Sequence, residues 1–160
     1  MLELPDSIRF FLDESLTPGV ADALLLVGYP ITSADQQCKR GVKDPLLIPW
    51  LAAEDYVWIT KDDEARREHL GDIIKAKIST VWIMGIDRKK NKISPLEVHL
   101  MLTTKLRRIA IAVDRARGPV HFEIYLKGED TPVLSPLDLV TLKRKQTSKQ
   151  RRLGRRRRPH

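Results

Sequence analysis

RFFLDESLTPG, residues 9–19, runs from a short apolar segment into two adjacent carboxylates and then into a helix start. The apolar run at 8–12 is rich in branched and aromatic residues and is bounded by Asp13, which is the pattern of a strand covered on both faces. Thr17 and Pro18 then predict the N-cap and the first residue of a helix that Gly28 would end. The stretch therefore predicts a buried strand, an acidic corner and a helix.

The same alternation of strand and helix patterns continues along the chain. We expect further strands at 30–34, 56–60, 79–84 and 119–126, the last at an edge of the sheet. Helices are expected after Asp44, which would cap one that Pro49 kinks or delays, after Thr60, and from about Pro95 to Arg115. The apolar positions of the long helix are Leu96, Leu100, Leu106, Ile109 and Val113. Strands separated by helices pair in parallel, so the fold class is α/β, a three-layer α/β/α sandwich with a mainly parallel central sheet.

Length and composition bound the class of protein. A chain of 160 residues is long enough for one domain with its own core. The single cysteine, Cys38, excludes an internal disulfide and any zinc site built on several thiolates, and it fits a reducing compartment. The first ten residues lack the pattern of a signal peptide, and no apolar run approaches the roughly 18 residues that span a bilayer. We therefore expect a cytoplasmic protein that does not enter a membrane.

The net charge of +8 is concentrated at one end of the chain. Residues 143–160 hold ten Lys or Arg and no acid, so residues 1–142 carry 19 basic against 21 acidic side chains. We expect a domain at 1–142 and a flexible basic tail at 143–160. Such a tail attracts phosphates, and it would also suit an acidic protein partner or serve solubility alone.

Carboxylates follow two of the predicted strands. Asp13 and Glu14 end the first strand, and Asp62, Asp63 and Glu64 follow the strand at 56–60. In parallel sheets ligands bind outside the carboxyl ends of the strands, so both groups fall on the binding edge. Asp44 joins them if its helix points its N-terminus at that edge.

Converging carboxylates raise one another's pKa values unless a cation neutralises them. Mg²⁺ or Mn²⁺ would do so, because these ions take oxygen ligands and need neither Cys nor His. We expect Asp13 and Asp62 to be direct ligands, with Asp44 beside them or acting through a water. The further ligand candidates are Glu14, Asp63 and Glu64.

Other side chains near these motifs suit phosphate binding. Ser15 and Thr60 would orient a ligand carboxylate or a metal-bound water. The basic candidates for contacts to flanking phosphates are Lys39, Arg40, Lys43, Lys61, Arg66 and Arg67.

Structural interpretations compete with several of these assignments. Asp44 before Pro45 also fits an ordinary N-cap, and acids in the first turn of a helix, such as Asp63 and Glu64, are favoured by the helix dipole. Glu14 also fits a solvated neighbour of Asp13. An acid at the carboxyl end of a buried strand costs desolvation, so Asp13 and Asp62 favour function.

FFLDESLTPGVADALLLVGYPI and, further on, GVKDPLLIPWLAAEDYVWITKDDEAR resemble the PIN-like family of small ribonucleases. The similarity is to the compact branch often found as the toxin of a bacterial type II toxin–antitoxin pair. In that branch a strand ends in Asp-Glu-(Asn/Ser)-Leu-x-Pro, a central Asp opens a helix, and another strand ends in Thr-Lys-Asp-x-(Asp/Glu). Residues 13–18, Asp44 and residues 60–64 match these elements, and the match covers about 8–86.

The resemblance implies Mg²⁺- or Mn²⁺-dependent hydrolysis of RNA phosphodiester bonds, with a cognate antitoxin protein as inhibitor and a homodimer as an open alternative to the monomer. The chain departs from the family where Glu64-Ala65 replaces the usual Asp-Phe. The fourth acid is therefore either Glu64 or Asp63.

Two other classes of function stay open. A receiver-like phosphoacceptor domain also has an acidic pair after its first strand and an Asp after its third. It needs a Ser or Thr at the end of the next strand, where this chain has Met84-Gly85. A non-catalytic module that binds RNA or a protein partner through the basic tail is the second alternative.

Overall fold

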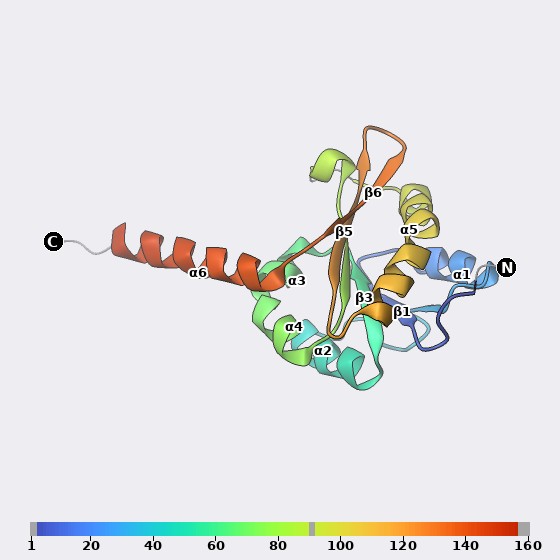
Figure 1. The fold of residues 1–160 in the computed structure, drawn as a ribbon, viewed down its shortest axis with the longest axis horizontal. Helices are drawn as coiled ribbons and strands as arrows, with labels where there is room; N and C mark the ends of the chain where they lie inside the picture. Colours follow the sequence, from blue (N-terminus) through green and yellow to red (C-terminus); the bar gives the residue numbers. More distant parts are fainter. Residues whose placement is uncertain (1–2, 90–91, 157–160) are drawn as a thin grey trace.

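A computed structural model describes residues 3–89 and 92–156 and confirms the predicted three-layer α/β/α sandwich (Figure 1). The central sheet has the order β2-β1-β3-β4-β5-β6. The first five strands are parallel, and β6 pairs antiparallel with β5. The strands are β1 (Arg9–Leu12), β2 (Ile31–Ser33), β3 (Tyr56–Thr60), β4 (Thr80–Ile83), β5 (His121–Lys127) and β6 (Thr131–Pro136).

Helices cover both faces of this sheet. They are α1 (Pro18–Leu26), α2 (Asp44–Ala53), α3 (Asp63–Glu68), α4 (Leu70–Ala76), α5 (Pro95–Arg115) and α6 (Leu139–Arg156), with a 3₁₀ turn at Ile86–Arg88. None of the helices in the described ranges is both long and apolar enough to cross a membrane.

Two cores form because successive strand residues point to opposite faces of the sheet. On β1, Phe10 and Leu12 pack into the core that holds the buried residues of α1 and α5. Phe11 points the other way, into the core formed with α2, α3 and α4. Every residue of β3 is buried, as the continuous apolar run predicted.

The start of α2 differs from the prediction. Lys43 is the N-cap and Asp44 is the first helical residue, so Asp44 is not the cap. The helix begins five residues before Pro49 and continues through it, so Pro49 does not delay the helix. Pro49 lacks the N–H that would bond to the carbonyl of Pro45, and the helix tolerates this loss in its second turn.

The strand at β5 was wrongly placed at the edge of the sheet. β6 pairs with it along six residue pairs, from Phe122 opposite Pro136 to Lys127 opposite Thr131. The two prolines of β6 argue against a strand in sequence alone, yet an edge strand accepts proline because one of its sides makes no ladder hydrogen bonds.

The long helix α5 has the predicted bounds, and a capping box of Ser94 and Glu97 fixes its start. Leu106 and Ile109 are buried as expected. Leu96 and Leu100 are not core residues, since 77% and 40% of their surfaces are exposed.

The basic segment after residue 142 is helical as far as Arg156, and α6 extends away from the body (Figure 1). Its first turn is anchored, because Leu139 and Leu142 pack on the core beside α4 and Asp138 accepts a hydrogen bond from the Thr141 amide at 3.0 Å. An anchored turn removes the cost of helix nucleation, and Lys, Arg and Gln are good helix formers.

Candidate functional site

Asp13 lies at the carboxyl end of β1, where the order of the sheet reverses between β1 and β3. Its side chain is buried, with 7% of the residue exposed. Oδ1 accepts hydrogen bonds from the amide of Ser15, at 3.0 Å, and from its hydroxyl, while Oδ2 accepts one from Nε1 of Trp58 at 3.0 Å. Burial raises the pKa of Asp13 to about 6 against the opposing effect of these hydrogen bonds.

Two hydroxyls join the end of β1 to the end of β3. Oγ of Ser15 lies 3.3 Å from Oγ1 of Thr60 and accepts a hydrogen bond from the amide of Lys61 at 3.0 Å. Oγ1 of Thr60 in turn accepts one from the amide of Asp62 at 3.0 Å. Ser15 thus contacts the carboxylate of Asp13 and the backbone that carries Asp62, which fixes the two motifs relative to each other.

Asp62 has a structural role besides its predicted one. It is the N-cap of α3, and its Oδ1 accepts hydrogen bonds from the amides of Glu64, at 3.0 Å, and Ala65, at 3.1 Å. The residue as a whole is exposed.

Asp44 faces the same region from the first turn of α2. Burial raises its pKa, the charges of Asp62 and Glu14 raise it further, and nearby His69 opposes them. The Nε2 atom of His69 lies 3.8 Å from Oδ2 of Asp44. The charges of Glu14 and Asp62 therefore both act on the carboxyl of Asp44.

Glu14 also holds the basic loop against this edge. Its Oε2 accepts a hydrogen bond from the amide of Gly41 at 2.7 Å. Gly41 has a φ angle of +77°, a backbone conformation that residues with a Cβ atom rarely adopt. The glycine thus lets the loop present its amide to Glu14.

The two candidates for the fourth acid differ in their surroundings. Asp63 pairs through Oδ1 with Nη2 of Arg66, at 2.6 Å, and through Oδ2 with Nε of Arg67, at 3.5 Å. Glu64 is exposed and lines a groove together with Asp62. Glu64 is therefore the less constrained of the two carboxylates.

The predicted phosphate-binding side chains occupy different positions. Lys61 and Arg67 line the same groove as Glu64, and Lys43 is exposed. Arg40 pairs with Asp35 at 3.2 Å, and Nζ of Lys39 lies 4.6 Å from the ring centroid of Trp50. Nη1 of Arg66 pairs at 2.7 Å with Glu123, so this guanidinium contacts two carboxylates of the protein. Its contact with a phosphate stays a prediction.

One wall of this site was not predicted from the sequence. The groove, of about 520 Å³, lies between the start of α3 and the segment after β4, and Arg88, Lys89 and Lys92 line it. The basic run at 88–92 was the available signal, but no motif connected it to the carboxylates. Buried Glu123 was also missed, because it lies within an apolar strand pattern.

Within residues 3–89 and 92–154, no three His, Cys, Asp or Glu side chains are arranged to hold one ion. The predicted ligands at this edge are carboxylates, and repulsion by Asp62 and Glu14 contributes to the raised pKa of Asp44. Their chemistry fits a hard cation such as Mg²⁺ or Mn²⁺.

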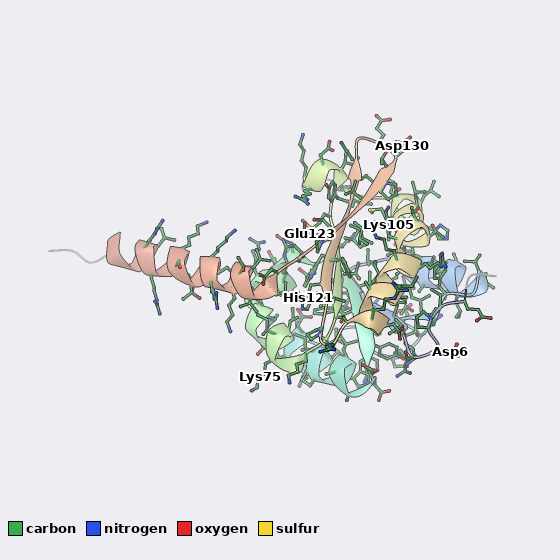
Figure 2. All side chains as sticks on the ribbon, in the orientation of Figure 1. Asp6, Lys75, Lys105, His121, Glu123 and Asp130 are labelled. Carbon is green, nitrogen blue, oxygen red and sulfur yellow. The ribbon has the colours of Figure 1, made fainter. Side chains whose placement is uncertain are left out.

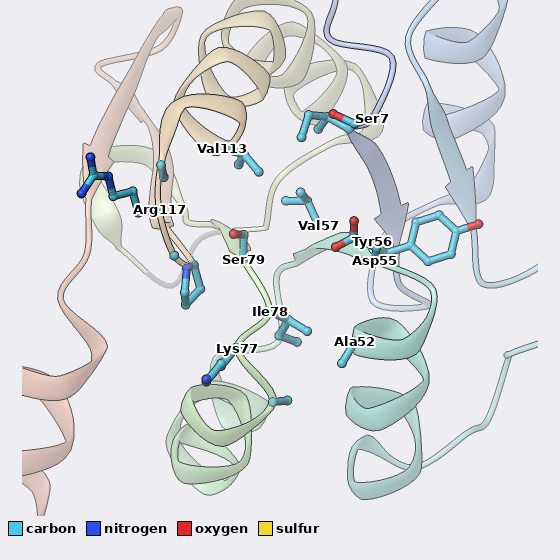
Figure 3. Close-up of a pocket in the computed structure, with 15 residues that line it drawn as sticks. Ser7, Ala52, Asp55, Tyr56, Val57, Lys77, Ile78, Ser79, Val113 and Arg117 are labelled. Carbon is cyan, nitrogen blue, oxygen red and sulfur yellow. The ribbon is translucent and has the colours of Figure 1, made fainter.

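A second hollow, of about 320 Å³, lies at the opposite edge of the sheet (Figure 3). Ser79, Lys77 and Asp55 line it near the amino ends of β3 and β4. It contains none of the predicted site residues, so the candidate chemistry stays at the carboxyl edge.

Comparison of the chain with protein-family models, with curated proteins and with solved structures finds no significant match.

Proposed function

We propose that this chain is a metal-dependent endoribonuclease that hydrolyses RNA phosphodiester bonds, of the toxin type of PIN-like protein. The observation that carries the proposal is the position of Asp13 and Asp62 after the carboxyl ends of the neighbouring parallel strands β1 and β3, beside the reversal of strand order, with Asp44 under the influence of the charges of Asp62 and Glu14. Ligands of open α/β sheets bind at this place.

Asp13 and Asp62 would supply carboxylate ligands to Mg²⁺ or Mn²⁺, with Asp44 beside them or acting through a water. When bound, the ion supplies a Lewis acid that polarises a phosphoryl oxygen and lowers the pKa of a water. Ser15 keeps the carboxylate of Asp13 in one orientation through its amide and its hydroxyl. Lys61 and Arg67, both exposed in the adjoining groove, would neutralise phosphates that flank the scissile bond.

The receiver-like alternative is less well supported. β4 ends at Ile83 and is followed by Met84 and Gly85, so no hydroxyl stands at the position where a receiver domain needs one. That class also leaves Asp44 without a role.

Cleavage of a mixed RNA pool by the purified full chain, with Mg²⁺ or Mn²⁺ and then with chelator, tests the proposal. The Asp62→Asn variant is the sharpest probe, because Asn caps a helix as well as Asp does and the fold should survive. Asp6→Asn is the matched control, because Asp6 is an exposed acid far from Asp62 in the sequence (Figure 2).

Metal-dependent cleavage that Asp62→Asn loses and Asp6→Asn keeps would support the proposal. Absence of cleavage with either ion, in a folded protein that still binds RNA, would favour the non-catalytic binding module. Transfer of a phosphoryl group from a small phosphodonor to Asp62 or Asp63 would favour the receiver-like class.

A further inference from the structure

The groove beside Asp62 has one wall that the candidate metal site does not use. Its lining includes Arg88, Lys89 and Lys92 from the segment after β4, and Lys61 and Arg67 from the start of α3. These five cations face three acids, which are Asp62, Asp63 and Glu64. Five cations against three acids leave an excess of positive charge in the lining, although Arg67 is paired with Asp63 and Arg88 with Glu123.

The wall is held in place by contacts to the sheet. The guanidinium of Arg88 lies 4.5 Å from the ring centroid of Tyr125, and its Nε lies 3.5 Å from Oε2 of Glu123. Asp87 accepts a hydrogen bond from the amide of Gly128, at 3.1 Å, which ties the 3₁₀ turn to the turn between β5 and β6. These contacts hold Arg88 against β5.

Glu123 connects this wall to α3. It is buried, with 8% of its surface exposed, and it also pairs with Arg66 at 2.7 Å. One buried carboxylate thus pairs with Arg88, which lines the groove, and with Arg66 of α3.

Part of the lining of the groove is apolar. Ile83, Met84 and Ile93 belong to it, and Gly85 adds no side chain. Cationic and apolar side chains in one groove suit a chain that carries phosphates on one side and flat bases on the other. A duplex keeps its bases stacked inside, whereas a single strand can place a base against apolar side chains.

We infer that this groove binds single-stranded RNA next to the carboxylates, with Arg88, Lys89 and Lys92 contacting its phosphates. The inference rests on the proposed function, which makes RNA the polyanion. Asp62 belongs to both the candidate metal site and the groove, because its charge acts on Asp44 and it lines the groove. A strand that enters here therefore reaches the carboxylates directly.

The test measures binding, not cleavage. A fluorescent 12-nucleotide RNA without secondary structure is titrated with the full chain in chelator, from about 50 to 200 mM salt, and a duplex of the same sequence is the comparison. The main variant, Lys89→Gln/Lys92→Gln, changes two exposed side chains and leaves the Glu123 contacts intact. Arg88→Gln is the second variant, and the matched control is Lys75→Gln/Lys77→Gln, which removes two exposed lysines at the end of α4.

We expect the main variant to bind the single strand roughly tenfold more weakly, with the slope of log K against log salt reduced by about 1.4 for two lost phosphate contacts. The control pair should match the wild type, and duplex affinity should change less than twofold. Equal losses for single strand and duplex would overturn the single-strand assignment. Unchanged affinity in both groove variants, or no binding of the single strand by the wild type, would overturn the groove itself. Because no metal is present, these outcomes are independent of whether the protein cleaves RNA.

Discussion

Nε1 of Trp58 donates a hydrogen bond to Oδ2 of Asp13 across the reversal point of the sheet, at a distance of 3.0 Å. Both residues are buried. Trp58 lies on β3, and Asp13 directly follows β1, the parallel strand beside it. A tryptophan of the hydrophobic core thus donates a hydrogen bond to a carboxylate of the candidate site.

We predict that Trp58→Phe raises the pKa of Asp13 above its value of about 6, because a hydrogen bond that stabilises the ionised carboxylate is lost. The variant should also lose about 1–3 kcal/mol of stability at pH 7, where a buried oxygen is left without its donor. Carboxyl carbon NMR gives the pKa, and urea unfolding gives the stability.

Trp82→Phe is the control for this change. Trp82 is equally buried and its Nε1 donates to Thr80, at 2.9 Å, so the same volume is lost without a contact to Asp13. A similar shift in the pKa of Asp13 in both variants would show that the Trp58 hydrogen bond has no specific effect.

Asp13 should make the free energy of unfolding depend on pH. Its pKa is 3.8 in the reference state and about 6 in the fold, so the folded state binds more protons between these values. The stabilising contribution of Asp13 to the free energy of unfolding is fully present below pH 3.8. It is lost as the pH rises through 6, and the loss amounts to up to about 3 kcal/mol. Relative to Asp13→Asn, the wild type should therefore weaken from pH 4 to pH 7. Urea unfolding across this range measures the difference, and a constant difference would contradict the raised pKa.

Half-buried Arg66 and buried Glu123 form an ion pair, and substitutions can separate the cost of losing one partner from that of losing both. Arg66→Met leaves Glu123, which is almost fully buried, without its closest cation, and should cost about 3–5 kcal/mol. Arg66→Met/Glu123→Leu should recover most of that loss, because replacing both partners removes the unpaired charge. Chemical unfolding of the two variants at pH 7 tests this, and equal destabilisation of both would refute the argument.

The fold was largely predictable because its signals are local. Continuous apolar runs predicted β3 and β4, and Thr17 with Pro18, and Pro95 further on, predicted the starts of α1 and α5. β6 was missed because its prolines are acceptable only at an edge, and being at an edge is a tertiary property.

The site was predictable only in part, for a related reason. Strand ends located Asp13 and Asp62, since the carboxyl edge follows from parallel pairing. The bond from Trp58 to Asp13 and the pair of Arg66 with Glu123 join residues 45 and 57 positions apart, and no periodicity encodes them.

Two substitutions at Asp62 separate its role as a helix cap from its proposed role as a metal ligand. Asp62→Ala removes the acceptor for the amides of Glu64 and Ala65 and should cost about 1 kcal/mol, whereas Asp62→Asn should keep nearly full stability. Thermal unfolding of both variants measures this contrast. Equal losses in the two variants would show that the charge, not the cap, stabilises the start of α3.

The basic helix α6 should add nucleic-acid affinity without supporting the body. Beyond its first turn its described side chains are mostly exposed, and Figure 2 shows them extending into open space around the helix. Six Lys or Arg lie within 143–154, a span of about 18 Å, and no acid separates them. Deleting residues 143–160 should reduce the slope of log K against log salt for RNA by roughly 2–4 and leave the free energy of unfolding within about 0.5 kcal/mol. Leu139 and Leu142 remain in the shortened chain, so the anchored turn keeps its core contacts. Salt titrations with fluorescent RNA, together with urea unfolding, measure both quantities. An unchanged slope would remove α6 from RNA binding, and a large loss of stability would show that the helix supports the body of the protein.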